Sequence, residues 1–215
     1  FIKLKTLADE QKAAYQVDKV HITDRIQEIK KELEELREKI SRLESDVLPF
    51  DKKYERAKQI IKSELAKWNI QTDVRLLAEL VQHVDKDWQL AIETFLGRKR
   101  FDSVVDGRYC EQVMEIVHDY QMRDIKVVIT DKLPKTDIIP GSAAEMLDIP
   151  NEDGRRYANY LLNGIHLCKD IQELHQYPKG GLMIDGTLAK SFTMSCMNME
   201  KTQIFMGHDA IKQQL

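Results

Sequence analysis

An uninterrupted heptad pattern between Ile22 and Val47 is the feature that most constrains how this chain can fold. Apolar residues recur at alternating spacings of four and three, and nearly all intervening positions are charged, Gln or Ser. This repeat predicts a coiled-coil seam, which is narrower than the apolar stripe of a helix lying on a globular domain. Such a lone amphipathic helix is the alternative. The seam residues are Ile22, Ile26, Ile29, Leu33, Leu36, Ile40, Leu43 and Val47.

The helical pattern continues beyond the seam. Pro49 is expected to end or kink the first helix, because proline lacks an amide hydrogen and clashes with the preceding turn. A second helical stretch follows, with Ile61, Leu65 and Trp68 on one face. We therefore predict a coiled-coil arm over residues 1–70, with a kink near Pro49.

Short alternating elements begin at residue 74 and predict an α/β (α+β) body over residues 74–206. Residues 75–84 fit either a strand or a short helix. Residues 208–215 are expected to start a helix that returns along the arm, so the body would sit at the tip of a long antiparallel coiled coil within a longer protein. Capping residues and apolar spacing predict helices at 85–97, 110–120, 151–164 and 170–177, strands at 101–106, 125–130, 165–168 and 202–207, and a hairpin at 181–198 that turns at Gly186–Thr187.

Composition and missing motifs exclude several classes of function. The net charge is −3, so any nucleic-acid contact must be a local basic patch. No apolar run approaches the ~20 residues that span a bilayer, and three widely spaced cysteines suggest a reducing cytoplasm rather than a disulfide framework. The sequence contains no phosphate loop, H-x-x-x-H pair or C-x-x-C pair. We therefore expect no catalytic residues, no metal, no cofactor and no membrane association.

Two basic clusters, "GRKR" (97–100) and "GRRY" (154–157), are candidates for DNA contact. Adjacent cations bind phosphates by releasing counterions, so the affinity they add falls steeply with salt. The alternative is a pair of solvated charge clusters beside neighbouring acids. The candidate DNA-binding residues are Arg98, Lys99, Arg100, Arg155 and Arg156.

The segment "SFTMSCMN" (191–198) predicts a strand that can pair with another copy of itself. Its residues are partly apolar, and neither proline nor a charge is present to discourage edge pairing. The candidate dimer-interface residues are Phe192, Met194 and Cys196. The alternative is an ordinary internal strand.

Three stretches together resemble the hinge domain of structural-maintenance-of-chromosomes (SMC) proteins. Residues 76–106 are similar to its first half, in which a helix ends in Leu-Gly before a basic residue and a Val-Val strand. "YANYLLNGIHLCKDIQEL" (157–174) and "GLMIDGTLAKSFTMSC" (181–196) are similar to its second half. The family's glycine-rich ending is absent, which puts the usual glycine-mediated dimer contact in doubt. "FMGHDAIKQQL" looks more like the JetC (Wadjet) or MukB-type branch, with JetC preferred.

The resemblance implies a hinge and dimerisation module of an SMC-like ATPase that entraps or translocates DNA in plasmid defence or chromosome organisation. It implies a homodimer through the hinge, salt-sensitive contact with double-stranded DNA, and kleisin-type and accessory subunits as partners of the parent complex. The ATPase heads would lie outside this chain, and the protein would be cytoplasmic and associated with DNA or the nucleoid. The alternative function is a coiled-coil adaptor or scaffold whose α/β head docks another protein.

Overall fold

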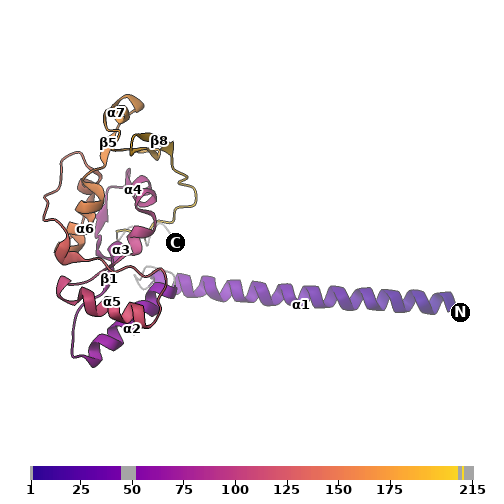
Figure 1. The fold of residues 1–215 in the computed structure, drawn as a ribbon. Coiled ribbons are helices and arrows are strands. Elements are labelled where there is room, and N and C mark those ends of the chain that lie inside the picture. The colour runs from indigo at the N-terminus through magenta and orange to yellow at the C-terminus, as the bar shows by residue number, and fades with distance from the viewer. Residues whose placement is uncertain (1, 45–51, 208–209, 211–215) are drawn as a thin grey trace. The chain divides into compact units, whose positions relative to one another are not determined.

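The computed structural model describes residues 2–44, 52–207 and 210, and it divides the chain into two units, Phe1–Pro49 and Phe50–Leu215 (Figure 1). The first unit contains one helix, α1 (Ile2–Glu44), of 43 residues. Its pairing as a coiled coil stays a prediction. The seam residues whose side chains are described, Ile22, Ile26, Ile29, Leu33 and Leu36, are all exposed, while the side chains of Ile40 and Leu43 and the whole of Val47 lie outside the described part.

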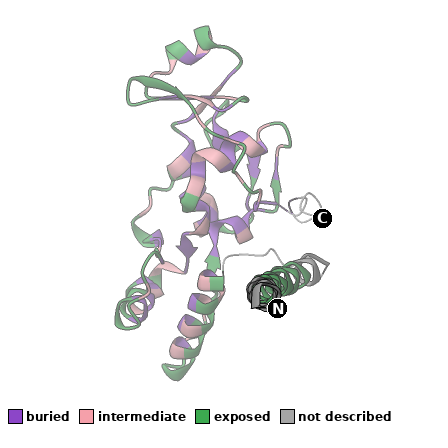
Figure 2. Ribbon diagram, turned by 90° about the vertical axis from the view of Figure 1, so that its right-hand side faces the viewer, coloured by how far each residue is buried: buried purple, intermediate pink, exposed green. Residues whose placement is uncertain are grey.

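Helix α2 (Lys52–Lys67) packs into the second unit rather than extending the arm. Its apolar residues recur at helical spacing and are buried along the face that lies beside α5 (Cys110–Asp119) (Figures 1 and 2). The compact unit therefore starts near residue 50, whereas the sequence placed the end of the arm at residue 70. The buried residues of α2 are Tyr54, Ala57, Ile61 and Leu65, and Trp68 follows the helix with 46% of its surface exposed.

The first half of the compact unit combines short strands with short helices. Strand β1 (Arg75–Leu76) pairs with β3 (Ser103–Val104), and β2 (His83–Val84) pairs with β4 (Leu147–Asp148), both antiparallel. Helix α3 (Leu77–Leu80) joins β1 to β2, so the ambiguous segment 75–84 contains both kinds of structure. The remaining short elements are the 3₁₀ helices η1 (Gly97–Phe101), η2 (Gly107–Tyr109), η3 (Thr130–Lys132) and η4 (Ala143–Met146).

Helix α4 (Gln89–Leu96) starts later than its sequence predicts but ends where expected. The sequence predicts Asp85 as the N-cap, but Asp85 lies four residues before α4, and its carboxylate caps the preceding turn by accepting from the backbone N–H groups of Asp87 and Trp88. Gly97 ends α4 at φ 51°, a conformation that glycine adopts without steric cost. The chain continues directly into η1, so the basic cluster lies in a 3₁₀ helix between α4 and β3.

The second half is a four-stranded sheet with two helices. Asn151 caps α6 (Glu152–Leu162), and Asp170 caps α7 (Ile171–Gln176) through its side chain. Strand β5 (His166–Cys168) is parallel to β6 (Gly180–Met183), which is followed by antiparallel β7 (Thr187–Lys190) and β8 (Thr193–Cys196), in the order β5-β6-β7-β8. The core beneath this sheet contains Cys168, Leu174 and Ala189.

Two predicted strands are wrong. In segment 125–130 a single parallel bridge joins Val127 to Ser103. Segment 202–207 belongs to no ladder in the described structure, because side chains of α4 and η1 bind its backbone instead. The returning helix predicted over 208–215 lies almost wholly outside the described residues.

Candidate dimerisation edge and basic surface

Among the described residues, strand β8 has a neighbouring strand on one side only and so forms an open edge of the four-stranded sheet. At the other edge, segment 141–143 covers β5, with Leu167 N–H donating to the Gly141 carbonyl at 3.0 Å. All four residues of β8 are exposed, and Met194 keeps 44% of its surface accessible. An exposed edge of this length offers unpaired backbone groups to another strand.

A two-residue turn at Ser191–Phe192 decides which backbone groups of β8 face outward. Both turn residues have left-handed φ values, 52° and 64°, as a tight hairpin of this kind requires. Thr193 is therefore paired closely with Lys190, and hydrogen bonding to β7 alternates along β8. The backbone N–H and C=O groups of Met194 and Cys196 consequently point away from β7.

The structure brings the three predicted dimer-interface residues together at this edge. Phe192 lies in the turn and not in the strand, with its N–H bonded to the Pro178 carbonyl at 2.8 Å and 71% of its surface exposed. Lys179 lies over its ring, with Nζ 5.7 Å from the centroid. Cys196 is an exposed free thiol at the far end of β8.

A second free edge, which the sequence did not predict, lies at residues 127–129. The Ser103 N–H donates to the Lys126 carbonyl at 2.8 Å, and the Val128 N–H donates to the Ser103 carbonyl at 2.9 Å. The Val127 N–H and C=O and the Ile129 N–H face the other way, and within the described residues no hydrogen bond is seen to them. Ile129 is 59% exposed and, with Leu133, Tyr157 and Tyr160, lines a hollow of about 400 Å³.

Arg100 is a structural residue and not an accessible cation. It is 7% exposed, forms an ion pair with the fully buried Glu93, and donates from Nη1 to the Gln203 carbonyl at 2.7 Å. This removes it from the predicted DNA-binding set. The three-residue turn of η1 points Arg100 inward, whereas Arg98 and Lys99 are exposed.

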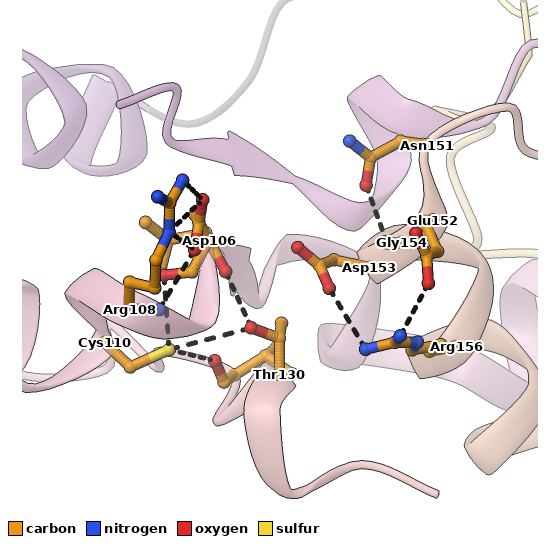
Figure 3. Close-up of polar contacts among 11 residues, drawn as sticks. Asp106, Arg108, Cys110, Thr130, Asn151, Glu152, Asp153, Gly154 and Arg156 are labelled. Atoms are coloured by element: carbon orange, nitrogen blue, oxygen red, sulfur yellow. Dashed lines mark hydrogen bonds and ion pairs between the residues drawn. The ribbon is translucent and has the colours of Figure 1, made fainter. Parts of the chain in front are cut away.

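Arg155 and Arg156 also have hydrogen-bond or ion-pair partners within the protein. The guanidinium of Arg155 donates to the carbonyls of Ala144 and Leu147 and so ties α6 to η4 and β4. Arg156 bonds to Glu152 and approaches Asp153 at 3.7 Å, with 17% of its side chain exposed (Figure 3). Neither side chain stands free for phosphate, so the second predicted basic cluster has a structural role.

Two lysines share the surroundings of Asp102, which lies at the end of η1. Burial raises the pKa of Asp102, while the hydrogen bond from Tyr157 and the charges of Lys126 and Lys99 lower it. Burial and the Asp102 carboxylate also raise the pKa of Tyr157. Lys126 is exposed, so it extends the accessible basic surface of Arg98 and Lys99 beyond the sequence cluster.

The described residues show neither a metal site nor a membrane span. They contain no group of three His, Cys, Asp or Glu side chains suited to hold a metal ion. No helix among them has the length and apolar character needed to cross a bilayer. Cys110 and Cys168 are buried free thiols, and the Cys110 Sγ contacts the Val128 carbonyl and lies near the Thr130 hydroxyl (Figure 3).

The mixed helix-and-sheet unit has the fold of the hinge domain of SMC proteins, as the sequence resemblance predicts. The chain matches the Pyrococcus furiosus SMC protein hinge domain at TM-score 0.51 and 16% identity, over 70% of this chain and 92% of that chain. It matches the Pyrococcus furiosus Smc hinge domain with an extended coiled coil at TM-score 0.53 and 16% identity, over 93% and 74% of the respective chains.

A third similar structure, the folded elbow of cohesin, has TM-score 0.54 and 14% identity over 86% of this chain and 28% of that chain. No protein-family model and no curated protein matches this chain. At these identities the likeness is one of fold.

Proposed function

We propose that this chain is the hinge-like dimerisation module of an SMC-like protein and that it pairs with a second copy through β8. The observation that carries the proposal is the open β8 edge, where Met194 and Cys196 present unpaired backbone groups beside the exposed ring of Phe192. The glycine-poor sequence of this edge does not prevent such pairing, because a ladder needs backbone groups and not glycine.

The second free edge supplies a complementary partner. Val127 offers an outward N–H and C=O, and Ile129 offers an outward N–H. The hollow beside Ile129 combines apolar and aromatic side chains, which can contact a ring such as that of Phe192, with the charged residues Asp102, Lys126 and Lys132. In a two-fold dimer, β8 of each copy would meet segment 127–129 of the other, so the contact would be made twice.

The parent protein would be an SMC-like ATPase whose heads lie outside this chain, and the hinge itself would not be catalytic. The exposed seam of α1 supports pairing with a returning helix, and the likeness to an Smc hinge with an extended coiled coil supports the same arrangement. By resemblance, we place the parent among the JetC (Wadjet) or MukB-type systems, with kleisin-type partners and a DNA-associated cytoplasmic location.

We further propose salt-sensitive contact with double-stranded DNA through Arg98, Lys99 and Lys126. These three side chains are exposed, and two of them lie close enough to Asp102 to affect its pKa. Each phosphate contact would release counterions, so the contribution would be greatest at low salt.

The alternative is an adaptor or scaffold whose α/β head docks another protein. It is favoured by the exposed seam of α1, which offers an apolar surface to any suitable helix. The two functions differ in which part of the chain self-associates, because an adaptor would not need the β8 edge.

Sedimentation of matched methionine variants tests the dimerisation proposal. Met194→Lys places a charge on β8, while Met114→Lys places the same charge on α5 at a methionine that is 48% exposed, close to the 44% of Met194. We expect the wild-type chain and Met114→Lys to form dimers, and Met194→Lys to dimerise at least about tenfold more weakly. Equal dimerisation of the three proteins would contradict pairing through β8.

A further inference from the structure

Phe205 and Met206, at the end of segment 203–206, lie in the core and belong to no β-ladder of the described structure. Phe205 and Met206 are 8% and 0% exposed, so their backbone groups have lost contact with water. Buried backbone groups must find other partners, because leaving one unsatisfied is costly. The partners here are side chains of α4 and η1.

Glu93 provides the acceptors that a neighbouring strand would otherwise supply. Its side chain is fully buried, its Oε2 accepts from the Phe205 N–H at 2.8 Å, and its Oε1 accepts from the Met206 N–H at 3.0 Å. Burial raises the pKa of Glu93, while Arg100 and the two N–H groups lower it. One carboxylate therefore satisfies two successive amides.

Two further side chains bind the carbonyl groups of the same segment. Gln89 Nε2 donates to the Met206 carbonyl at 2.7 Å, and Arg100 Nη1 donates to the Gln203 carbonyl at 2.7 Å while remaining paired with Glu93. The turn at Gly97 brings Arg100 back beside α4, and Arg100 Nε donates to the Gly97 carbonyl at 2.8 Å.

A row of three aromatic rings, one pair tilted and the other edge-to-face, extends these contacts to α2. Phe101 lies between Tyr54 and Phe205, with both pairs of ring centroids 5.1 Å apart. The guanidinium carbon of Arg100 lies 5.2 Å from the Phe101 centroid and 5.4 Å from the Phe205 centroid. Thus η1 contacts both α2 and segment 203–206, and α4 contacts the same segment.

We propose that Gln89, Glu93 and Arg100 form a clamp that holds segment 203–206 against η1 and α2 as a separately opening unit. A buried ion pair adds little stability over apolar side chains of the same shape, but its geometry is specific. Because no ladder joins this segment to the β5–β8 sheet in the described structure, breaking the clamp should loosen the segment while the hydrogen bonds of the sheet persist. The inference is independent of the proposed dimerisation.

Residue-resolved hydrogen exchange of the full chain tests the clamp. Glu93→Gln keeps the shape of the side chain but replaces one acceptor with an NH₂ group facing a backbone N–H and removes the charge beside Arg100. We expect the amides of Phe205 and Met206 to exchange about tenfold faster or more, with rates in β6 and β7 unchanged. The matched control is Glu152→Gln, which breaks an exposed ion pair with Arg156 and should leave the segment protected.

A milder variant keeps the test decisive if Glu93→Gln does not fold. Gln89→Met has a similar length and lacks the amide that binds the Met206 carbonyl. It should accelerate exchange in segment 203–206 selectively, though less than Glu93→Gln. Unchanged exchange at Phe205 and Met206, or equal acceleration in the segment and in β6–β7, would overturn the clamp.

Discussion

The Tyr157 hydroxyl on α6 donates a hydrogen bond to the carboxylate of Asp102, which lies 55 residues earlier at the end of η1. Both residues are buried, so this bond joins the two halves of the compact unit through one charged acceptor. Loss of this hydrogen bond is therefore expected to lower the free energy of unfolding.

Tyr157→Phe should lower the free energy of unfolding by about 1–3 kcal/mol, because a buried carboxylate loses a hydrogen-bond donor. Urea denaturation measures this change. Tyr160→Phe is the control, since Tyr160 on the same helix is 61% exposed. Equal stability of Tyr157→Phe and the wild-type chain would show that Asp102 does not depend on the hydroxyl.

Reversing the charges of Arg98 and Lys99 should weaken binding to duplex DNA. Replacing both with Glu removes two phosphate contacts. The negative slope of log affinity against log salt should therefore become shallower by about 2. Fluorescence anisotropy over a range of salt concentrations measures this slope.

The control for the DNA variant is Lys30→Glu with Lys31→Glu, an adjacent exposed pair on α1 that gives the same change in net charge. A similar loss in both double variants would mean that net charge, and not the η1 surface, determines binding.

Protonation of Asp106 should lower the free energy of unfolding at acidic pH. The Arg108 guanidinium and N–H hold the pKa of Asp106 at about 2 (Figure 3). Because this pKa lies below the unfolded value of about 3.9, the stabilisation is full above pH ~4 and is lost as pH falls through about 2. The effect should be small, since the pair is largely exposed.

Asp106→Asn keeps an oxygen that can accept from the Arg108 N–H and removes the titrating group. Its free energy of unfolding should therefore change less between pH 5 and pH 2 than that of the wild-type chain. Asp87→Asn, at an exposed aspartate outside η2, should retain the wild-type pH dependence. Identical pH profiles for all three proteins would rule out a contribution from Asp106.

Asn163 should anchor the loop between η3 and η4. Its Nδ2 donates to the Asp137 carbonyl at 2.9 Å, and its Oδ1 accepts from the Ile139 N–H at 3.1 Å. Asn163→Ala should cost about 1–3 kcal/mol of unfolding free energy and speed proteolysis within residues 134–140. Asn198→Ala, at an exposed asparagine, is the control, and equal cleavage of the two variants would contradict the anchoring role.

The sequence predicts the elements that carry local signals. Gly97 ends α4 as predicted, and helices form within the predicted ranges 110–120, 151–164 and 170–177, where the structure adds Asn151 and Asp170 as caps of the last two. These features depend on a few neighbouring residues, so a single sequence contains the information that determines them.

The remaining errors involve contacts between distant residues. Apolar runs at 125–130 and 202–207 resemble strands in sequence. However, Phe205 donates to Glu93, which lies 112 residues earlier, and no local sequence pattern predicts that bond. Likewise, three adjacent cations look equivalent in sequence, and only their partners distinguish the buried Arg100 from Arg98 and Lys99. Tertiary contacts decide both cases.

The chain has three cysteines, and Cys196 is the exposed one, placed on β8 where a second copy would pair. Its thiol can therefore report on that edge without any engineered label. Alkylation would be fast in dilute protein and would slow as concentration rises, while the two buried thiols remain unmodified in both regimes. The rate of Cys196 alkylation, measured by mass spectrometry on the unmutated protein, would therefore report the fraction of β8 edges that are paired.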